Sequence, residues 1–177
     1  MKTRTLGRTG LEVSEVGFGG WAAGGGYGPV DEGEARAALE KAWELGVNFF
    51  DTADSYGQGR GESLLGAFLR EKPRDRCVVA TKAGWDFYHG AVRKRFDGDY
   101  LRQACERSLE RLGLETIDLY QLHNPPAEAL RKGDALETLQ RLQGEGKIRF
   151  IGVSVHRPGE FQACLEDGRV DALQMAF

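Results

Sequence analysis

The chain has 177 residues, which is enough for one domain with a sizeable core. Hydrophobic residues make up 41% and charged residues 29% of the chain, which excludes a disordered segment. A net charge of -3 gives no basic surface for nucleic acid or anionic lipid. The first residues lack the apolar core of a signal peptide, and no apolar run approaches the ~20 residues that span a bilayer. We therefore expect a cytoplasmic protein without nucleic-acid or membrane partners.

The cysteines give no sign of a disulfide framework or a metal site. They are odd in number and show no C-x-x-C spacing, so we expect three buried thiols in a reducing compartment: Cys77, Cys105 and Cys164. The short basic run 93–95 lies in a predicted loop, and we interpret it as solvated surface.

Strand and helix patterns alternate along the chain. Alternating residues at 3–6 and 11–13 flank the glycines of 7–10 and predict a small hairpin. Apolar runs then predict strands at 16–19, 47–51, 77–82, 117–123, 148–154 and 172–177. Helical spacing predicts helices at 31–45, 61–70, 97 or 99 to 112, 135–143 and 161–165. Such alternation with apolar strands predicts an α/β fold, a parallel sheet covered by helices.

Four of these strands end on a polar residue: Asp51, Lys82, His123 and Ser154. Each of them alone has a plain structural explanation, as a helix cap or a polar group at a strand end. The carboxyl ends of parallel strands share one edge, however, and that edge holds the active site in (β/α)8 barrels. Four polar strand ends in succession therefore favour a functional site.

These side chains suit proton transfer to a carbonyl group. The side chain of a free tyrosine has a pKa near 10, and a neighbouring ammonium stabilises a phenolate. Lys82 supplies that ammonium, and Asp51 keeps it charged and in place. Tyr56 would then act as general acid while His123 orients a carbonyl oxygen. A hydride donor completes such a reaction, and nicotinamide is the usual one.

Two other interpretations fit the sequence less well. Residues 17–22 match the G-x-G-x-x-A fingerprint of dinucleotide-binding Rossmann units. The helical pattern begins only near Asp31, however, and Asp51 comes later than the usual ~20 residues. A serine hydrolase is disfavoured because no G-x-S-x-G motif is present, and neither Ser63 nor Ser154 has an obvious base.

Four motifs in order resemble the aldo-keto reductases. They are LGRTGLEVSEVGFGGW at 6–21, FDTADSYGQGRGESLLG at 50–66, ATKAG at 80–84 and LYQLHNP at 119–125. The resemblance covers essentially the whole chain. It implies a TIM-type (β/α) barrel that binds NADPH or NADH without a Rossmann fold and reduces a small-molecule carbonyl compound, or oxidises the corresponding alcohol.

The resemblance also implies roles for individual residues. The catalytic tetrad would be Asp51, Tyr56, Lys82 and His123, with Tyr56 as the acid. Cofactor-binding residues would be Gly20, Trp21, Asp51, Ser154 and Gln174, the last two holding the nicotinamide carboxamide. Substrate-binding residues would be Trp21, Tyr56, Trp85 and His123, and no metal is implied.

Some positions depart from the family pattern or stay open. The family often has Asn after the strand-five serine, but Val155 and His156 follow here. His156 is either a replacement for that contact or an exposed loop residue. Trp85, Phe87 and Tyr88 either wall an apolar substrate pocket or pack against the barrel rim.

The length of the chain predicts an incomplete barrel. Barrels of this kind run to ~250 residues, whereas 177 residues supply about six strands. We expect residues 1–177 to form a single domain that contains the first six βα units behind a hairpin and lacks the last strands and helices. Unclosed sheet edges would then favour self-association, and cofactor binding would be weak. An inactive fragment and a cofactor-sensing module of the same fold are the alternatives to an enzyme.

Overall fold

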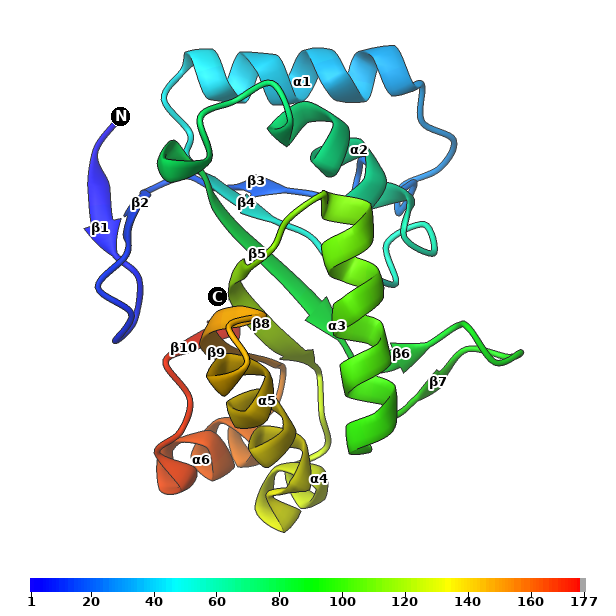
Figure 1. Cartoon of the computed structure of the whole chain (residues 1–177), viewed down its shortest axis with the longest axis vertical. Coiled ribbons are helices and arrows are strands. Elements are labelled where there is room, and N and C mark those ends of the chain that lie inside the picture. The colour runs from blue at the N-terminus through cyan, green and yellow to red at the C-terminus, as the bar shows by residue number, and fades with distance from the viewer. Residues whose placement is uncertain (176–177) are drawn as a thin grey trace.

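A six-stranded, all-parallel sheet forms the centre of the protein in the computed structural model, which describes residues 1–175 (Figure 1). The strand order is β10-β9-β8-β5-β4-β3, so β10 and β3 are the two edges. The strands are β3 (Phe18–Gly19), β4 (Phe49–Asp51), β5 (Val78–Ala83), β8 (Ile117–His123), β9 (Ile148–Val155) and β10 (Ala172–Met175). The last two residues of the predicted sixth strand, Ala176 and Phe177, lie outside the described residues.

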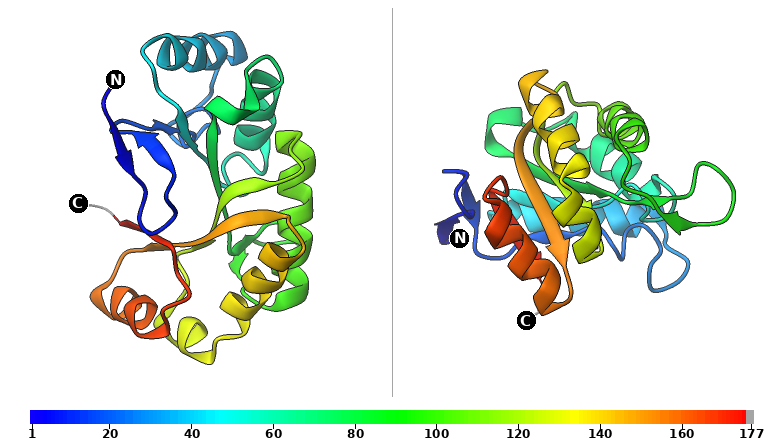
Figure 2. Two further views of the ribbon diagram at one scale, coloured as in Figure 1. Left: turned by 60° about the vertical axis from the view of Figure 1, so that its left-hand side comes forward. Right: turned by 90° about the horizontal axis from the view of Figure 1, so that it is seen from below.

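Within residues 1–175, six α-helices follow the outer side of this curved sheet, and the other side is open (Figure 2, left). They are α1 (Glu32–Glu44), α2 (Arg60–Leu69), α3 (Gly98–Leu112), α4 (Ala127–Lys132), α5 (Asp134–Gly144) and α6 (Pro158–Asp167), with a short 3-10 helix at Arg74–Arg76. This arrangement confirms the predicted incomplete (β/α) barrel. Within residues 1–175, no helix has the length and apolar character needed to cross a membrane.

The predicted hairpin is formed by β1 (Thr3–Thr5) and β2 (Glu12–Ser14), which pair antiparallel. It lies on the open side of the sheet (Figure 2). Its tip reaches the segment before β10, where the Arg8 guanidinium donates to the carbonyl oxygens of Gly168 and Val170, both at 2.6 Å. The hairpin thus links the first residues of the chain to the last strand.

The two faces of the sheet bury different residues. Phe50 and Val79 belong to the large core between the sheet and the helices, together with the buried free thiols of Cys77, Cys105 and Cys164. Their neighbours Phe49 and Ala80 belong to a small apolar cluster on the inner face. Because side chains alternate along a strand, residues two positions further on share that inner face. The inner face is therefore apolar at one end and carries polar residues at the carboxyl end.

Local sequence explains where the long helices begin and end. Asp31 caps α1 by accepting a hydrogen bond from the Glu34 N–H at 3.0 Å. Of the two aspartates predicted to start α3, Asp97 is the cap and accepts from the Tyr100 N–H at 3.1 Å. Gly113 ends α3 with a φ of 67°, a left-handed conformation that glycine adopts without strain.

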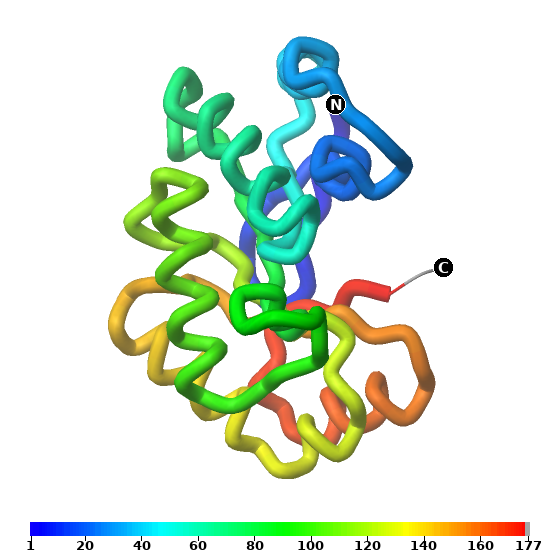
Figure 3. Tube along the Cα trace, turned by 90° about the vertical axis from the view of Figure 1, so that its right-hand side faces the viewer, coloured from blue at the N-terminus to red at the C-terminus, as the bar shows by residue number. Residues whose placement is uncertain are grey.

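A hairpin and a helix were not expected from the sequence. The segment after β5, predicted as a loop, contains a hairpin of β6 (Trp85–Asp86) and β7 (Arg93–Lys94), which faces the viewer in Figure 3. Strands of two residues are too short to show a periodic pattern. The helix α4 follows Pro126, where only a loop was predicted. The first predicted strand is also shorter than expected, because only 18–19 pair with β4.

Candidate active site

The four residues of the expected tetrad meet at the carboxyl end of the sheet. Asp51 is the last residue of β4, Lys82 lies near the end of β5 and His123 ends β8. Tyr56 lies in the turn between β4 and α2. Strand register aligns Asp51 with Ala80 and His123 with Ser154, so side chains far apart in sequence face one space.

Lys82 connects the members of this group. Its side chain is only 2% exposed, and its ammonium donates to the Asp51 Oδ2 at 2.7 Å and to the Thr52 carbonyl at 2.8 Å. The third contact is a longer one, 3.5 Å to the Tyr56 hydroxyl. An ammonium has three N–H donors, so Lys82 uses each of them inside the protein. The buried charge is therefore paired and points at the phenol.

Asp51 is held by more than Lys82. The Gln121 amide donates to its Oδ1 at 3.2 Å, and the Gln174 amide donates to its Oδ2 at 3.1 Å. The two amides also contact each other, since the Gln121 Nε2 lies 3.3 Å from the Gln174 Oε1. Gln121 was missed in the sequence analysis. Its signal was a glutamine inside a predicted buried strand.

His123 is an uncharged imidazole in this site. Burial lowers its pKa to about 3, and the positive charges of Lys82, His156 and Lys94 act in the same direction. Its Nδ1 is buried and has no hydrogen-bond partner among residues 1–175. A neutral imidazole keeps one N–H donor. His123 is thus suited to donating a hydrogen bond to an oxygen rather than to transferring a proton.

This charge state predicts a simple titration result. The chain has three histidines. In proton NMR spectra, the ring signals of His123 should stay constant from about pH 8 to about pH 5, because its lowered pKa lies below this range. An unperturbed histidine would titrate near 6.5. His123→Asn assigns the signal by removing it. A midpoint near 6.5 for that signal would contradict the assignment of a buried neutral ring.

Two indoles stand on either side of the Tyr56–His123 pair. Trp21 lies edge-on to Tyr56 with ring centroids 4.9 Å apart, and Trp85 lies edge-on to His123 at 6.5 Å. Gly20 precedes Trp21 and donates its N–H to the Asp51 carbonyl at 2.7 Å. A Cβ at Gly20 would lie 2.8 Å from the Thr52 hydroxyl, so only glycine allows this close approach. Trp21 is 45% exposed, so part of this indole faces solvent.

A cavity of about 280 Å³ opens beside the tetrad. Strand register places His123, Ser154 and Gln174 in one row along its floor. The Ser154 hydroxyl donates to the Asn124 Oδ1 at 3.1 Å, and Asn124 was not singled out from the sequence. Its signal was an asparagine next to His123, here with a φ of 55°. His156 is exposed and also borders the cavity.

The aromatic residues after β5 divide between the two roles considered for them. Trp85 reaches His123. Phe87 instead packs on Tyr88, with centroids 4.0 Å apart, and the Tyr88 hydroxyl accepts from Arg111 of α3 at 3.0 Å. Only Trp85 of these three therefore contacts a tetrad side chain.

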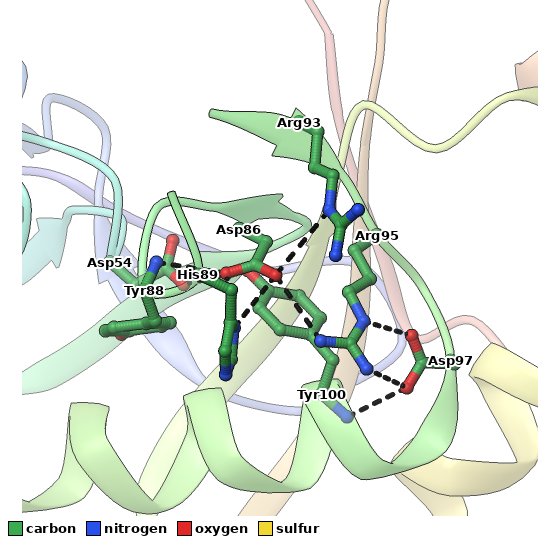
Figure 4. A network of polar contacts seen from close by, with 8 residues as sticks. All are labelled: Asp54, Asp86, Tyr88, His89, Arg93, Arg95, Asp97 and Tyr100. Carbon is green, nitrogen blue, oxygen red and sulfur yellow. Dashed lines mark hydrogen bonds and ion pairs between the residues drawn. The ribbon is translucent and has the colours of Figure 1, made fainter. Parts of the chain in front are cut away.

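Ion pairs fix the hairpin that carries Trp85 (Figure 4). Asp86 is buried, and its carboxylate lies 3.4 Å from the Arg95 guanidinium and 3.0 Å from the His89 ring. Arg95 also pairs with the cap residue Asp97 at 2.5 Å. The interpretation of 93–95 as solvated surface is therefore wrong for Arg95. Lys94 points elsewhere and donates to the Asn124 carbonyl at 2.7 Å.

With this geometry in view, the comparisons with known proteins decide the family. The sequence model of the Aldo/keto reductase family matches residues 15–177. The chain belongs to this family. Among solved structures, the aldo-keto reductase AKR11C1 from Bacillus halodurans, in its holo form, superimposes with a TM-score of 0.90 at 35% identity. That match covers 100% of this chain and 58% of the other.

Other relatives also match most of this chain. L-Galactose dehydrogenase of Arabidopsis thaliana is 39% identical over 160 residues, which is 87% of this chain and 48% of the relative. The uncharacterized oxidoreductase YqkF of Bacillus subtilis is 34% identical, over 100% of this chain and 56% of its own length. The glycerol dehydrogenase AKR11B4 from Gluconobacter oxydans superimposes with a TM-score of 0.83 at 32% identity, over 98% of this chain and 54% of its own. The chain thus spans about half the length of the relatives it matches.

Proposed function

We propose that the chain carries the proton-donating and carbonyl-binding part of an NAD(P)H-dependent oxidoreductase that interconverts an aldehyde or ketone and an alcohol. The observation that carries the proposal is the Lys82 ammonium, which joins the Asp51 carboxylate and the Tyr56 hydroxyl at 2.7 and 3.5 Å. Dehydrogenase and reductase names among the relatives support the same reaction class.

In the direction of reduction, Tyr56 donates its proton to the carbonyl oxygen as that oxygen gains negative charge. The Lys82 ammonium stabilises the phenolate left behind, because opposite charges attract strongly at a buried site. Asp51 balances the charge of Lys82, so the site does not hold an unpaired buried cation. His123 donates a hydrogen bond to the same carbonyl oxygen and fixes its position.

The residues around the cavity also fit a nicotinamide cofactor, for which we propose NADPH. Ser154, Asn124 and Gln174 offer hydroxyl and amide groups, the donors and acceptors that a primary carboxamide pairs with. The cofactor would supply the hydride when bound. Gly20 and Trp21 would line its entrance, and Trp21 and Trp85 would wall the substrate. Small apolar carbonyl compounds such as benzaldehyde suit these indoles.

Two measurements on the purified chain test this function. Titration with NADPH and with NADH, followed by tryptophan fluorescence, should show saturable quenching because Trp21 lies beside Tyr56. Benzaldehyde should then drive NADPH oxidation, and size-exclusion chromatography should report self-association through the edges at β3 and β10. Saturable binding without turnover would support a cofactor-sensing module instead. Neither binding nor turnover would support an inactive fragment.

A further inference from the structure

A second buried carboxyl group lies directly behind the active-site turn. Asp54 is two residues before Tyr56, and its side chain is fully buried. Its Oδ2 has one contact, with the Tyr100 hydroxyl at 3.4 Å, and its Oδ1 has no hydrogen-bond partner among residues 1–175. Figure 4 draws Asp54 together with Tyr88 and Tyr100. None of the tetrad contacts uses this carboxyl group.

Asp118 shows by contrast how the same fold accommodates a buried carboxylate. It is also fully buried, but Arg74 and Arg149 each donate to it at 2.7 Å. The Val79 N–H adds a third hydrogen bond at 2.9 Å. A buried ionised carboxylate without such donors costs several kcal/mol. Among residues 1–175, Asp54 has the long Tyr100 contact and the N–H of the adjacent Ser55 but no hydrogen bond from a cation, which is what an uncharged carboxyl group tolerates.

The charged and titratable groups around Asp54 also favour its uncharged form. Burial raises the pKa of Asp54 well above its ordinary value, and the negative charge of Glu62 on α2 adds to that effect. Arg111 on α3 and hydrogen bonds from the Ser55 N–H and the Tyr100 hydroxyl lower this pKa, but Arg111 is already paired with Glu62 at 2.6 Å. The remaining titratable groups around Asp54 are the phenols of Tyr88, Tyr100 and Tyr120, whose own pKa values burial raises. They are uncharged at neutral pH and bring no cation to Asp54.

The backbone of Asp54 belongs to the active site. Its N–H donates to the Lys82 carbonyl at 3.0 Å. Thr52, two residues earlier, accepts the Lys82 ammonium through its carbonyl. The Tyr56 N–H closes the turn on the Ala53 carbonyl at 3.1 Å. A displacement of the Asp54 side chain would therefore move the turn that presents the Tyr56 hydroxyl to Lys82.

We propose that Asp54 is a positioning residue for Tyr56 and that it holds the turn at 52–56 through an uncharged carboxyl group packed against Tyr100. This inference rests on the proposed function, because it assigns Asp54 a task in presenting the proton donor. It adds a further side chain beyond the tetrad on which the geometry of the reaction depends.

The first test compares unfolding of the wild-type chain and Asp54→Asn as a function of pH. Unfolded Asp54 releases its proton near pH 4, whereas the folded group keeps it, so stability is lost as pH rises above about 4. Asparagine mimics the uncharged acid and does not titrate. The ratio of the wild-type to the Asp54→Asn unfolding constant should therefore rise with pH, by up to about tenfold per unit, until the folded group ionises. A flat or falling ratio would overturn the proposal.

The second test measures positioning by hydrogen exchange of backbone amides. Asp54→Val should speed exchange in the turn at 52–56 and leave α5 unchanged, whereas Asp54→Asn should match the wild type in both. If Asp54→Val does not fold, Asp54→Leu takes its place, and the pH test on Asp54→Asn still decides the charge state. Unchanged exchange in the turn for the folded apolar variant would show that Asp54 positions nothing.

Neither of these measurements needs turnover. If both tests give the expected results but the chain never oxidises NADPH, the proposed function is refuted and the role of Asp54 in holding the turn stands. In an active chain, Asp54→Val should lower kcat for benzaldehyde while the KM for NADPH stays constant, and Asp54→Asn should restore kcat. A loss of kcat in both variants would argue against the uncharged carboxyl group.

Discussion

Replacing Tyr56 with phenylalanine is expected to lower carbonyl reduction by about 100- to 10,000-fold, the usual contribution of a positioned general acid. The change removes one hydroxyl and keeps the ring that packs between Trp21 and His123 at centroid distances of 4.9 and 5.8 Å. NADPH affinity should therefore stay within about twofold, because this hydroxyl contacts Lys82 rather than the cavity floor. Initial rates with benzaldehyde and fluorescence titration of NADPH measure the two effects separately.

Tyr27 offers a matched control for this substitution. It is 86% exposed and touches the same indole, with a centroid distance of 6.5 Å to Trp21, but it has no contact with Lys82. Tyr27→Phe should leave both kcat and cofactor affinity near the wild-type values. Turnover by Tyr56→Phe at the Tyr27→Phe level would mean that another group supplies the proton.

Replacing Arg111 with methionine is expected to lower the free energy of unfolding by about 3–5 kcal/mol, because it leaves a buried charge without its partner. Glu62 is fully buried on α2, and its carboxylate accepts from the Arg111 Nε at 2.6 Å and from the Thr81 hydroxyl at 2.5 Å. The pair joins α2, α3 and β5 behind the active site. Denaturant unfolding monitored by circular dichroism measures the loss.

An exposed ion pair gives the comparison for this variant. Arg102 makes two hydrogen bonds of 2.6 Å to Glu145, but both side chains are more than one third exposed. Arg102→Met should therefore cost much less than Arg111→Met. The double variant with Glu62→Gln and Arg111→Met should recover part of the loss, since no charge is then left unpaired. Equal losses in the two single variants would contradict the buried-charge explanation.

The gathering of the tetrad could be predicted from the sequence because it follows from two simple regularities. Parallel strands bring their carboxyl ends to one edge, and side chains two residues apart share one face. Phe49 with Asp51, and Ala80 with Lys82, show the resulting change from apolar to polar along the inner face. The strand ends and the family motifs together therefore indicated where the candidate site would lie.

Contacts that depend on strand register or on the burial of a turn could not be predicted from these sequence patterns. The pairing of Gln121 with Asp51 requires the relative shift of β8 and β4, which are not neighbours in the sheet. The turn at 52–56 looks like a polar loop in sequence, yet Asp54 is fully buried. The hairpin that carries Trp85 has strands of two residues, too short for any periodicity.

The internal hydrogen bonds of the Gln174 amide affect how tightly the neighbouring cavity binds a ligand. In the structure this side chain is already committed, since it donates to Asp51 at 3.1 Å and accepts from Gln121 at 3.3 Å. A ligand that recruits the same amide must compete with these internal partners. Its apparent dissociation constant then equals the intrinsic one divided by the fraction of molecules in which Gln174 is free. The hydrogen bonds from Gln174 that hold Asp51 in place would thus lower the affinity of the neighbouring cavity for its ligand. A Gln174 substitution would change both the position of Asp51 and that affinity.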